Sequence, residues 1–423
     1  MGLNAIVTFL CVAQRGDWNV ALHGRKSYTA VDSKGDKQLH GAWKVKKRQT
    51  KRQSKSDKGL SSVLFASLKT VRPSGDATLP AKLERMLAEF DLRSLCEGNR
   101  VPIKMHLGGA VGFTTIHPRL VRVVVNAVKQ AGGQPFVVDG YFDSVLHAAE
   151  RGYTAETLGC PIMPAGGPMD THVVPVKIGF RALDRINVFG AIWDAKCLIN
   201  LSHVKGHGDC GYGGACKNIA MGCVDAETRS KIHSLEGGIK WDQAKCTFCG
   251  RCVKACDTGA ITINKKSRQV SIFFHNCRYC RHCISACPQD ALEMTDEKGF
   301  RDFQVGMALT TKAILDSFES GKVLHINVLT NITQLCDCWG FSTASMVPDI
   351  GIMASQDIVA LEKACLDAIT VENFIPGTLI GDASLGPGEH LLEKVHGKDP
   401  FVQIREMEKR GIGRSNYIIR EIK

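Results

Sequence analysis

The sequence lacks any hydrophobic run long enough to cross a membrane. None of its apolar stretches approaches the roughly 18 to 20 residues that a bilayer span requires. The opening segment MGLNAIVTFLCVA is partly apolar, but it has neither a positive n-region nor a small-x-small cleavage site. We therefore expect no membrane span.

Two nucleotide-binding fingerprints are also missing. No G-x-G-x-x-G motif follows a predicted strand, which removes the usual signal for a flavin or nicotinamide cofactor. The Gly-rich stretch before Lys217 is not a Walker A loop, because its Gly and Lys are not adjacent and no Ser or Thr follows the lysine. The composition is not that of a disulfide scaffold either, since 18 cysteines in 423 residues are only about 4% of the chain.

The net charge of +12 is concentrated at one end of the chain. Residues 1–58 hold 13 Lys or Arg against 4 Asp, and they include the run KVKKRQTKRQSKSDK. Such a polar basic segment predicts a disordered extension over residues 1–60. Binding to RNA, DNA or an anionic membrane is the alternative, but nucleic acid is disfavoured because no aromatic interleaving or folded nucleic-acid motif accompanies the charge.

Eight of the cysteines form two copies of the spacing C-x2-C-x2-C-x3-C. This is the bacterial double-cluster ferredoxin pattern, in which the fourth Cys of each run ligates the other cluster. Two 4Fe-4S clusters are expected, and zinc is the weaker alternative because it would leave the third Cys of each triplet without a role. The predicted cages are Cys246, Cys249, Cys252 with Cys287, and Cys277, Cys280, Cys283 with Cys256. The protein is expected to be cytoplasmic because cysteines that ligate clusters must stay reduced.

Outside residues 236–298, which hold the two cysteine runs and are called the cysteine segment, strand-like and helix-like stretches alternate. SVLFASL, VPIKMHL, QPFVVDG and KCLINLS read as strands with helical segments between them, and KVLHINVL and DIGIMAS continue the pattern after Gly299. This alternation predicts an α/β fold with a mainly parallel sheet and flanking helices. Because neither part looks complete alone, we expect residues 61–235 and 299–423 to form one discontinuous domain, interrupted by a small ferredoxin-like α+β module at 236–298.

Ionisable residues gather where the predicted strands end, the edge at which open α/β sheets bind ligands. The segment NLSHVKGHGDCGYGGACKNIAMGC, residues 200–223, is the richest, and it predicts a site for a carboxylate or phosphate with an imidazole for proton transfer. The alternative is that these side chains only hydrogen-bond an irregular loop. The predicted catalytic residues are His203, Lys205 and His207, and the predicted cofactor-binding residues are Lys104, His106, Gly213, Gly214, Lys217 and Asn218. Other strand-end residues are Asp139, Ser202, Asn331, Thr333 and Asp349.

A C-x-C motif, Cys336-Asp337-Cys338, is the second group of interest. Its two sulfurs lie on the same face of an extended segment, so they suit one further metal, a cluster edge or a reversible disulfide. Simple packing is the competing interpretation.

Together, these motifs resemble a known family. IKMHLGG, SHVKGHGDCGYGGACKNIAMGC, the doubled cysteine runs, CDCWG and VPDIGIMAS are similar to the prokaryotic iron-sulfur family called domain of unknown function 362. The resemblance runs from about residue 62 to the C-terminus, with Val204 and Tyr212 where the family pattern has Phe. The resemblance implies cluster binding but no established reaction. The residues that match the family pattern are His203, Lys205, His207, Gly213, Gly214, Lys217 and Asn218.

The sequence favours an oxidoreductase that passes electrons from a redox partner protein or low-potential donor, through two clusters, to a small anionic ligand. An electron carrier or accessory protein without a catalytic site is one alternative, and a cluster-based sensor is another. Residues 200–223, which are rich in acidic and basic side chains, favour the oxidoreductase. The absence of a flavin or nicotinamide fingerprint leaves the two alternatives open.

Overall fold

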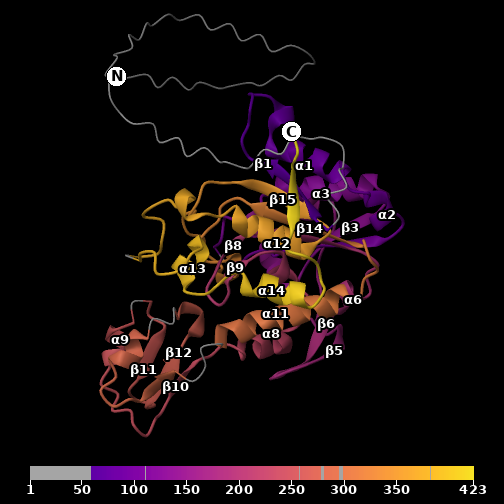
Figure 1. Cartoon of the computed structure of the whole chain (residues 1–423). Helices are drawn as coiled ribbons and strands as arrows, with labels where there is room; N and C mark the ends of the chain where they lie inside the picture. Colours follow the sequence, from indigo (N-terminus) through magenta and orange to yellow (C-terminus); the bar gives the residue numbers. More distant parts are fainter. Residues whose placement is uncertain (1–58, 110, 257, 278–280, 295–298, 382) are drawn as a thin grey trace, which may run out of the picture. The chain divides into compact units, whose positions relative to one another are not determined.

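The computed structural model describes residues 59–109, 111–256, 258–277, 281–294, 299–381 and 383–423. The predicted basic extension lies almost wholly outside these residues, and so does Cys280. An eight-stranded sheet in the order β16-β1-β15-β14-β7-β2-β3-β4 forms the centre (Figure 1). Its strands are β1 (Ser61–Ser67), β2 (Arg100–Lys104), β3 (Gln134–Asp139), β4 (Ile162–Pro164), β7 (Leu198–His203), β14 (Val323–Leu329), β15 (Gly351–Ser355) and β16 (Tyr417–Glu421).

Neighbouring strands of this sheet are parallel except at β15, which runs antiparallel to both β1 and β14. The predicted α/β fold with a mainly parallel sheet and flanking helices is therefore confirmed. Strands from both sides of the cysteine segment build the sheet, because β7 pairs with β14 in register from Leu198 opposite Val323 to His203 opposite Val328.

Alternation along the strands gives the sheet two apolar faces. In β1, Val63 and Phe65 pack into one core, whereas Leu64 and Ala66 pack into the other. Figure 1 shows the indigo and purple helices of the second core and the orange and yellow helices of the first on opposite sides of β14 and β15. The second core contains α1 (Leu79–Ala88), α2 (Leu92–Cys96) and α3 (Pro118–Gln130), and the first contains α7 (Ala215–Ala220), α8 (Ala226–His233), α11 (Gly299–Leu315), α12 (Ile358–Asp367), α13 (Leu391–His396) and α14 (Val402–Lys409).

Two helical stretches end early. Residues 142–151 form the short α4 (Phe142–Leu146) followed by a 3-10 helix, His147–Arg151. Helix α11 ends at Leu315, where the Ser317 hydroxyl donates to the carbonyl of Ile314. Within the described part of the chain, no helix combines the length and the apolar character needed to cross a bilayer.

Short hairpins and helices connect these larger elements. The antiparallel pairs are β5 (Val173–Phe180) with β6 (Leu183–Phe189), and β8 (Lys205–His207) with β9 (Gly211–Gly213). The helices are α5 (Ala155–Leu158) and α6 (Gly190–Trp193). A further hairpin, β11 (Ile261–Asn264) with β12 (Gln269–Ile272), belongs to the cysteine segment.

The cysteine segment has a hydrophobic cluster of its own. Strands β10 (Ile239–Trp241) and β13 (Leu292–Met294) pair antiparallel at its two ends. One-turn helices α9 (Arg251–Lys254) and α10 (His282–Ser285) follow the start of each cysteine run. Ile239, Ile261 and Leu292 pack together with cysteines of both runs. The segment thus buries apolar surface separately from the two faces of the large sheet.

A buried carboxyl, Glu362 on α12, makes stability depend on pH. It accepts hydrogen bonds from the N–H of Ala215 at 2.5 Å and from Nδ2 of Asn327 at 3.0 Å. Burial nevertheless raises the pKa of Glu362 to about 7. The unfolded carboxyl has a lower pKa, so the folded state holds a proton that the unfolded state releases, and stability falls as pH rises from about 4.5 to 7.

Replacing Glu362 with glutamine is expected to remove this penalty. The Glu362→Gln variant should gain stability relative to the wild type as pH rises, by about 3 kcal/mol at most. Urea unfolding at about pH 5 and about pH 8 checks this. The exposed Glu84→Gln variant is the matched control and should show no such divergence. If the free energy of unfolding depended on pH equally in Glu362→Gln and wild type, the raised pKa of Glu362 would be wrong.

Candidate functional site

A pocket of about 690 Å³, measured with the solvent at its mouth, lies at the carboxyl ends of β2, β3 and β7. Four basic and two acidic side chains line it, as do two histidines. The lining residues are Lys104, His106, Asp139, Gly140, Tyr141, Ser144, His203, Lys205, Gly213, Gly214, Lys217, Asn218, Met221, Gly222, Arg229, Cys336, Asp337 and Cys338. The structure therefore brings together most of the residues that the sequence predicts at this edge.

Asp139, at the end of β3, organises one side of the pocket. Its Oδ1 accepts from Nζ of Lys104 at 3.0 Å and from the N–H of Gly140 at 2.8 Å. Its Oδ2 pairs with Nδ1 of His106 at 3.0 Å and accepts from the N–H of Leu107 at 2.9 Å. Burial alone would raise the pKa of Asp139, but the charges of Lys104 and His106 and these hydrogen bonds hold it well below its usual range. The carboxylate is therefore a fixed anion.

The second nitrogen of His106 is left for a ligand. Nε2 of His106 is shielded from solvent and has no hydrogen-bond partner among the described residues. Because the Asp139 carboxylate accepts the proton of Nδ1, a neutral ring presents an unprotonated Nε2. A carboxylate that orients an imidazole in this way is the usual arrangement behind a general base or a metal ligand.

Arg229 supplies an unsatisfied donor to the same pocket. Its guanidinium lies 3.7 Å above the ring of Tyr141, and its Nη2 is buried without a hydrogen-bond partner among the described residues. Burial lowers the pKa of Arg229 to about 10, so the group still carries its charge at neutral pH. A buried, unpaired guanidinium nitrogen is costly unless an anion fills the space beside it.

His203 and Lys205 are held by Asp337 rather than presented to a ligand. Nδ1 of His203 lies 2.7 Å from Oδ2 of Asp337, and its Nε2 lies 2.7 Å from the carbonyl oxygen of Thr330. Nζ of Lys205 lies 3.3 Å from Oδ1 of Asp337 and donates to Oγ1 of Thr114 at 2.9 Å. Both ring nitrogens of His203 are therefore engaged. Of the two histidines that line the pocket, His106 is the one with a ring nitrogen that has no hydrogen-bond partner among the described residues.

Burial also affects the charged groups of this trio. It lowers the pKa of Lys205, against the opposing charge of Asp337. It would raise the pKa of Asp337, but the charges of His203 and Lys205 outweigh it and hold the carboxyl below its usual range.

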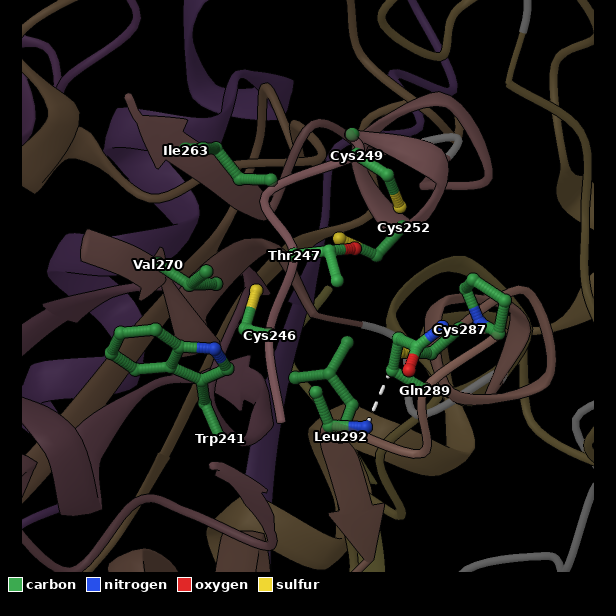
Figure 2. A pocket seen from close by; sticks show the side chains of 13 residues that line it. Trp241, Cys246, Thr247, Cys249, Cys252, Ile263, Val270, Cys287, Gln289 and Leu292 are labelled. Carbon is green, nitrogen blue, oxygen red and sulfur yellow. Dashed lines mark hydrogen bonds between the residues drawn. The ribbon is translucent and has the colours of Figure 1, made fainter. Parts of the chain in front are cut away.

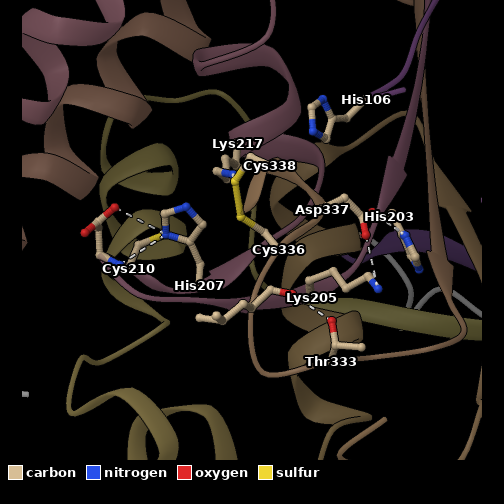
Figure 3. The surroundings of a disulfide bond; sticks show 12 residues. His106, His203, Lys205, His207, Cys210, Lys217, Thr333, Cys336, Asp337 and Cys338 are labelled. Atoms are coloured by element: carbon tan, nitrogen blue, oxygen red, sulfur yellow. Dashed lines mark hydrogen bonds and ion pairs between the residues drawn. A yellow bond between two sulfur atoms is a disulfide. The ribbon is translucent and has the colours of Figure 1, made fainter. Parts of the chain in front are cut away.

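Cys336 and Cys338 are joined in a disulfide, and Lys217 points at both sulfurs (Figure 3). Nζ of Lys217 lies 3.4 Å from Sγ of Cys336 and 3.3 Å from Sγ of Cys338. Burial lowers the pKa of Lys217, partly offset by nearby acidic groups. His207 is not among the lining residues; its ring lies beside the disulfide, and it is buried.

The Gly-rich segment forms regular secondary structure. Residues 205–213 form the buried hairpin of β8 and β9, and α7 begins at Ala215, two residues before Lys217. The N–H of Ala215 donates to Glu362 inside the protein. Asn218 donates Nδ2 to the carbonyl of Lys104 at 3.0 Å and accepts from Nζ of Lys104 at 2.9 Å, so it braces the pocket wall.

A second pocket, of about 350 Å³, lies within the cysteine segment. Its lining includes Cys246, Cys249, Cys252 and Cys287, three cysteines of the first run and the last cysteine of the second run. Figure 2 shows this group beside Trp241 and Ile263. Backbone N–H groups point at sulfur: that of Phe248 donates to Cys246 at 3.4 Å and that of Ala291 to Cys287 at 3.3 Å.

The other predicted cage is only partly described. Cys256, Cys277 and Cys283 belong to the hydrophobic cluster of the segment, whereas Cys280 lies outside the described residues. In the first group, a backbone hydrogen bond at Arg251 lowers the pKa of the Cys249 thiol, and burial raises that of Cys252.

Asp337, Arg229 and Tyr141 line the pocket but are not among the predicted site residues. Asp337 lies within the C-x-C motif that the sequence singles out, but the motif itself draws attention only to the two sulfurs. Arg229 and Tyr141 carry no signal in the sequence, since they come from α8 and the start of α4 and meet only in the folded chain. Of the other strand-end residues, Ser202, Asn331, Thr333 and Asp349 do not line the pocket.

Comparisons with known proteins place the chain in a family without an assigned reaction. A crystal structure of a Thermotoga maritima protein from a structural genomics consortium matches with a TM-score of 0.32 and 9% identity, over 61% of this chain and 52% of that one. The chain thus spans about half the length of that protein. No curated protein matches. The model of the family described as domain of unknown function (DUF362) matches residues 101–367, a shorter region than the motifs predict. The chain belongs to the DUF362 family.

Proposed function

We propose that the protein is an iron-sulfur oxidoreductase that passes electrons to a small anionic substrate or cofactor in the pocket at the sheet edge. The observation that carries the proposal is the pair of buried nitrogens in that pocket, Nε2 of His106 and Nη2 of Arg229, which have no partner among the described residues. One can exchange a proton and the other can hold negative charge, so the pocket has the parts of a reaction site as well as those of a binding site.

The charge of the lining favours an anion. Four basic side chains face two carboxylates, and both carboxylates are already engaged by Lys104, His106, His203 and Lys205. The positive charge left over comes from Arg229 and Lys217. A ligand carboxylate or phosphate would give Nη2 of Arg229 an acceptor.

The position of His106 favours proton transfer at the ligand. Asp139 holds the ring through Nδ1, and Lys104 and two backbone N–H groups hold Asp139 in turn. The imidazole therefore keeps one orientation while Nε2 takes up or releases a proton. Histidine is the side chain that most often serves as a general acid or base.

The cysteine segment, residues 236–298, fits two 4Fe-4S clusters and would form the small ferredoxin-like module between the two parts of the α/β domain. The four cysteines that line one pocket are the donor set that the doubled spacing predicts, and backbone N–H groups directed at sulfur are typical of cluster ligands. Bound clusters supply one-electron transfer. A low-potential donor or a redox partner protein would provide the electrons, and a reducing cytoplasm would keep the ligands as thiols.

A reoxidation screen tests the proposal. Anaerobically reconstituted protein is reduced with dithionite, separated from the excess, and mixed with individual small carboxylates and phosphates while the visible cluster absorbance is followed. We expect at least one anion to reoxidise the clusters and to be reduced in return. A protein that no small anion reoxidises, but that reduces a partner protein at full rate, would be the electron carrier instead.

Arg229→Gln is expected to weaken anion binding without disturbing the clusters. Loss of one charge-assisted hydrogen bond costs about 1.5 to 3 kcal/mol, which is roughly a tenfold to hundredfold loss of affinity. Calorimetric titration with the anion found in the screen measures the change. Arg185→Gln is the matched control, because Arg185 lies on β6 and does not line the pocket. Equal affinity in Arg229→Gln and wild type would remove Arg229 from the site.

A further inference from the structure

The C-x-C segment sends its central and flanking side chains in opposite directions. Asp337 reaches His203 and Lys205, whereas the disulfide of Cys336 and Cys338 lines the pocket. Cys336 is only 6% exposed, but Cys338 is open to solvent. One sulfur of the bridge can therefore meet a molecule in the pocket while the other stays covered, an asymmetry typical of disulfides that react.

Lys217 gives the sulfurs a partner that a purely structural bridge does not need. Within the described part of the chain, Nζ of Lys217 donates its hydrogen bonds to the sulfurs of Cys336 and Cys338. Disulfide sulfur is a weak acceptor, so a half-buried ammonium gains little from it. A thiolate at either position would turn the same contact into a charge-assisted one. The surroundings therefore favour the reduced pair more than an ordinary disulfide site does.

His207 favours a redox role over a metal site. Its ligand atom and the two sulfurs all lie within 4.8 Å of one another, a spacing that also suits a metal ion. However, Nδ1 of His207 lies 3.2 Å from the N–H of Asp209, which donates to it. The proton of a neutral ring then sits on Nε2, so a metal ion bound there would have to displace it. Figure 3 shows the ring beside the bridge.

The residue after Cys338 contacts the cysteine segment. The ring of Trp339 meets the ring of Phe273 edge to face, with centroids 5.9 Å apart. Phe273 follows β12 and precedes Cys277 by four positions, so this aromatic contact joins the loop of the bridge to the second cysteine run. The loop of the bridge and the cysteine segment are therefore in direct contact.

We infer that Cys336 and Cys338 form a reversible two-electron couple that works in the pocket. The disulfide takes up two electrons and two protons, its S–S bond breaks, and two thiols form. The reductant is a low-potential one-electron donor acting twice, or a dithiol. The reverse step returns two electrons and two protons to an oxidised anionic ligand and closes the bridge again. The inference rests on the proposed redox function, and it names the group in the pocket that stores an electron pair.

The couple is tested by its redox equilibrium, without any assay of turnover. Protein handled under argon is equilibrated at a series of reduced-to-oxidised dithiothreitol ratios and quenched with iodoacetamide. Peptide mass spectrometry then gives the bridged fraction of Cys336 and Cys338. We expect a two-electron transition that reverses on reoxidation, whereas the buried Cys197 and Cys365 stay thiols throughout. A bridge that persists at ratios that reduce thioredoxin in the same tube would overturn the inference.

Lys217→Met separates a reactive couple from a structural disulfide and from a zinc site. Loss of the ammonium should lower the equilibrium constant for reduction about tenfold, which is a midpoint about 30 mV more negative. Lys312→Met, which removes a lysine paired with Asp316 on the surface, should leave the midpoint unchanged. An unshifted midpoint in Lys217→Met would overturn the inference, and so would stoichiometric zinc bound by reduced wild type but not by His207→Ala. Iron and sulfide are measured on the same samples. Absence of clusters would refute the proposed electron transfer through them, but it would not contradict the redox couple of Cys336 and Cys338.

Discussion

A Cys287→Ser variant is expected to lose one of two clusters, so that iron and acid-labile sulfide each fall from about eight to about four per chain. Cys287 lies 31 positions after Cys256, yet it lines one pocket with Cys246, Cys249 and Cys252. Serine is a poor substitute for a thiolate ligand. The change should therefore damage the cluster of the first run and spare most of the other. Iron and sulfide analysis of anaerobically reconstituted protein measures it.

Double variants test this exchange of ligands between the runs. Cys249→Ser combined with Cys287→Ser should be little worse than either change alone, because both remove ligands from the same cage. Cys249→Ser combined with Cys283→Ser should instead remove both clusters. Cys160→Ser is the matched control, since Cys160 is buried in the core of the large sheet. Tightly bound zinc with no acid-labile sulfide in the wild type would show that the cluster assignment is wrong.

The fold followed from the sequence because strand and helix periodicity is a local property. Short apolar strands such as 198–203 and 323–329 are buried along almost their whole length, as a sheet covered on both faces requires. The direction of β15 did not follow, because a strand's own residues look the same whether it runs parallel or antiparallel to its neighbours. That direction is fixed by the connection from β14, which returns through residues 330–350 without a crossover helix.

The edge of the sheet that carries the pocket was also predictable, but the roles within it were not. Parallel strands bring their carboxyl ends together, so Lys104, Asp139 and His203 had to meet. Which imidazole remains free depends on partners far away in the sequence. Thr330 and Asp337 occupy His203, whereas among the described residues only Asp139 engages a ring nitrogen of His106. Motif spacing could not reveal that difference.

Replacing His106 with asparagine is expected to slow turnover by about a hundredfold or more, since a general acid or base contributes about that much. An asparagine amide can still donate to Asp139, so the pocket should keep its shape while losing the proton carrier. Reoxidation of the reduced protein by the anion from the screen measures the rate, and cluster absorbance and thermal unfolding report on integrity. His147→Asn, a change of an exposed histidine paired with Glu150, is the matched control.

The division of effects between His106 and Arg229 distinguishes an enzyme from a carrier. If His106 moves a proton, His106→Asn should lower kcat with little change in affinity, and Arg229→Gln should do the reverse. Nε2 of His106 and Nη2 of Arg229 belong to the same pocket. An electron carrier performs no reaction in that pocket, so it would use neither group. Unchanged electron delivery in both variants would therefore assign the pocket a structural role and leave the cysteine segment as the working part of the molecule.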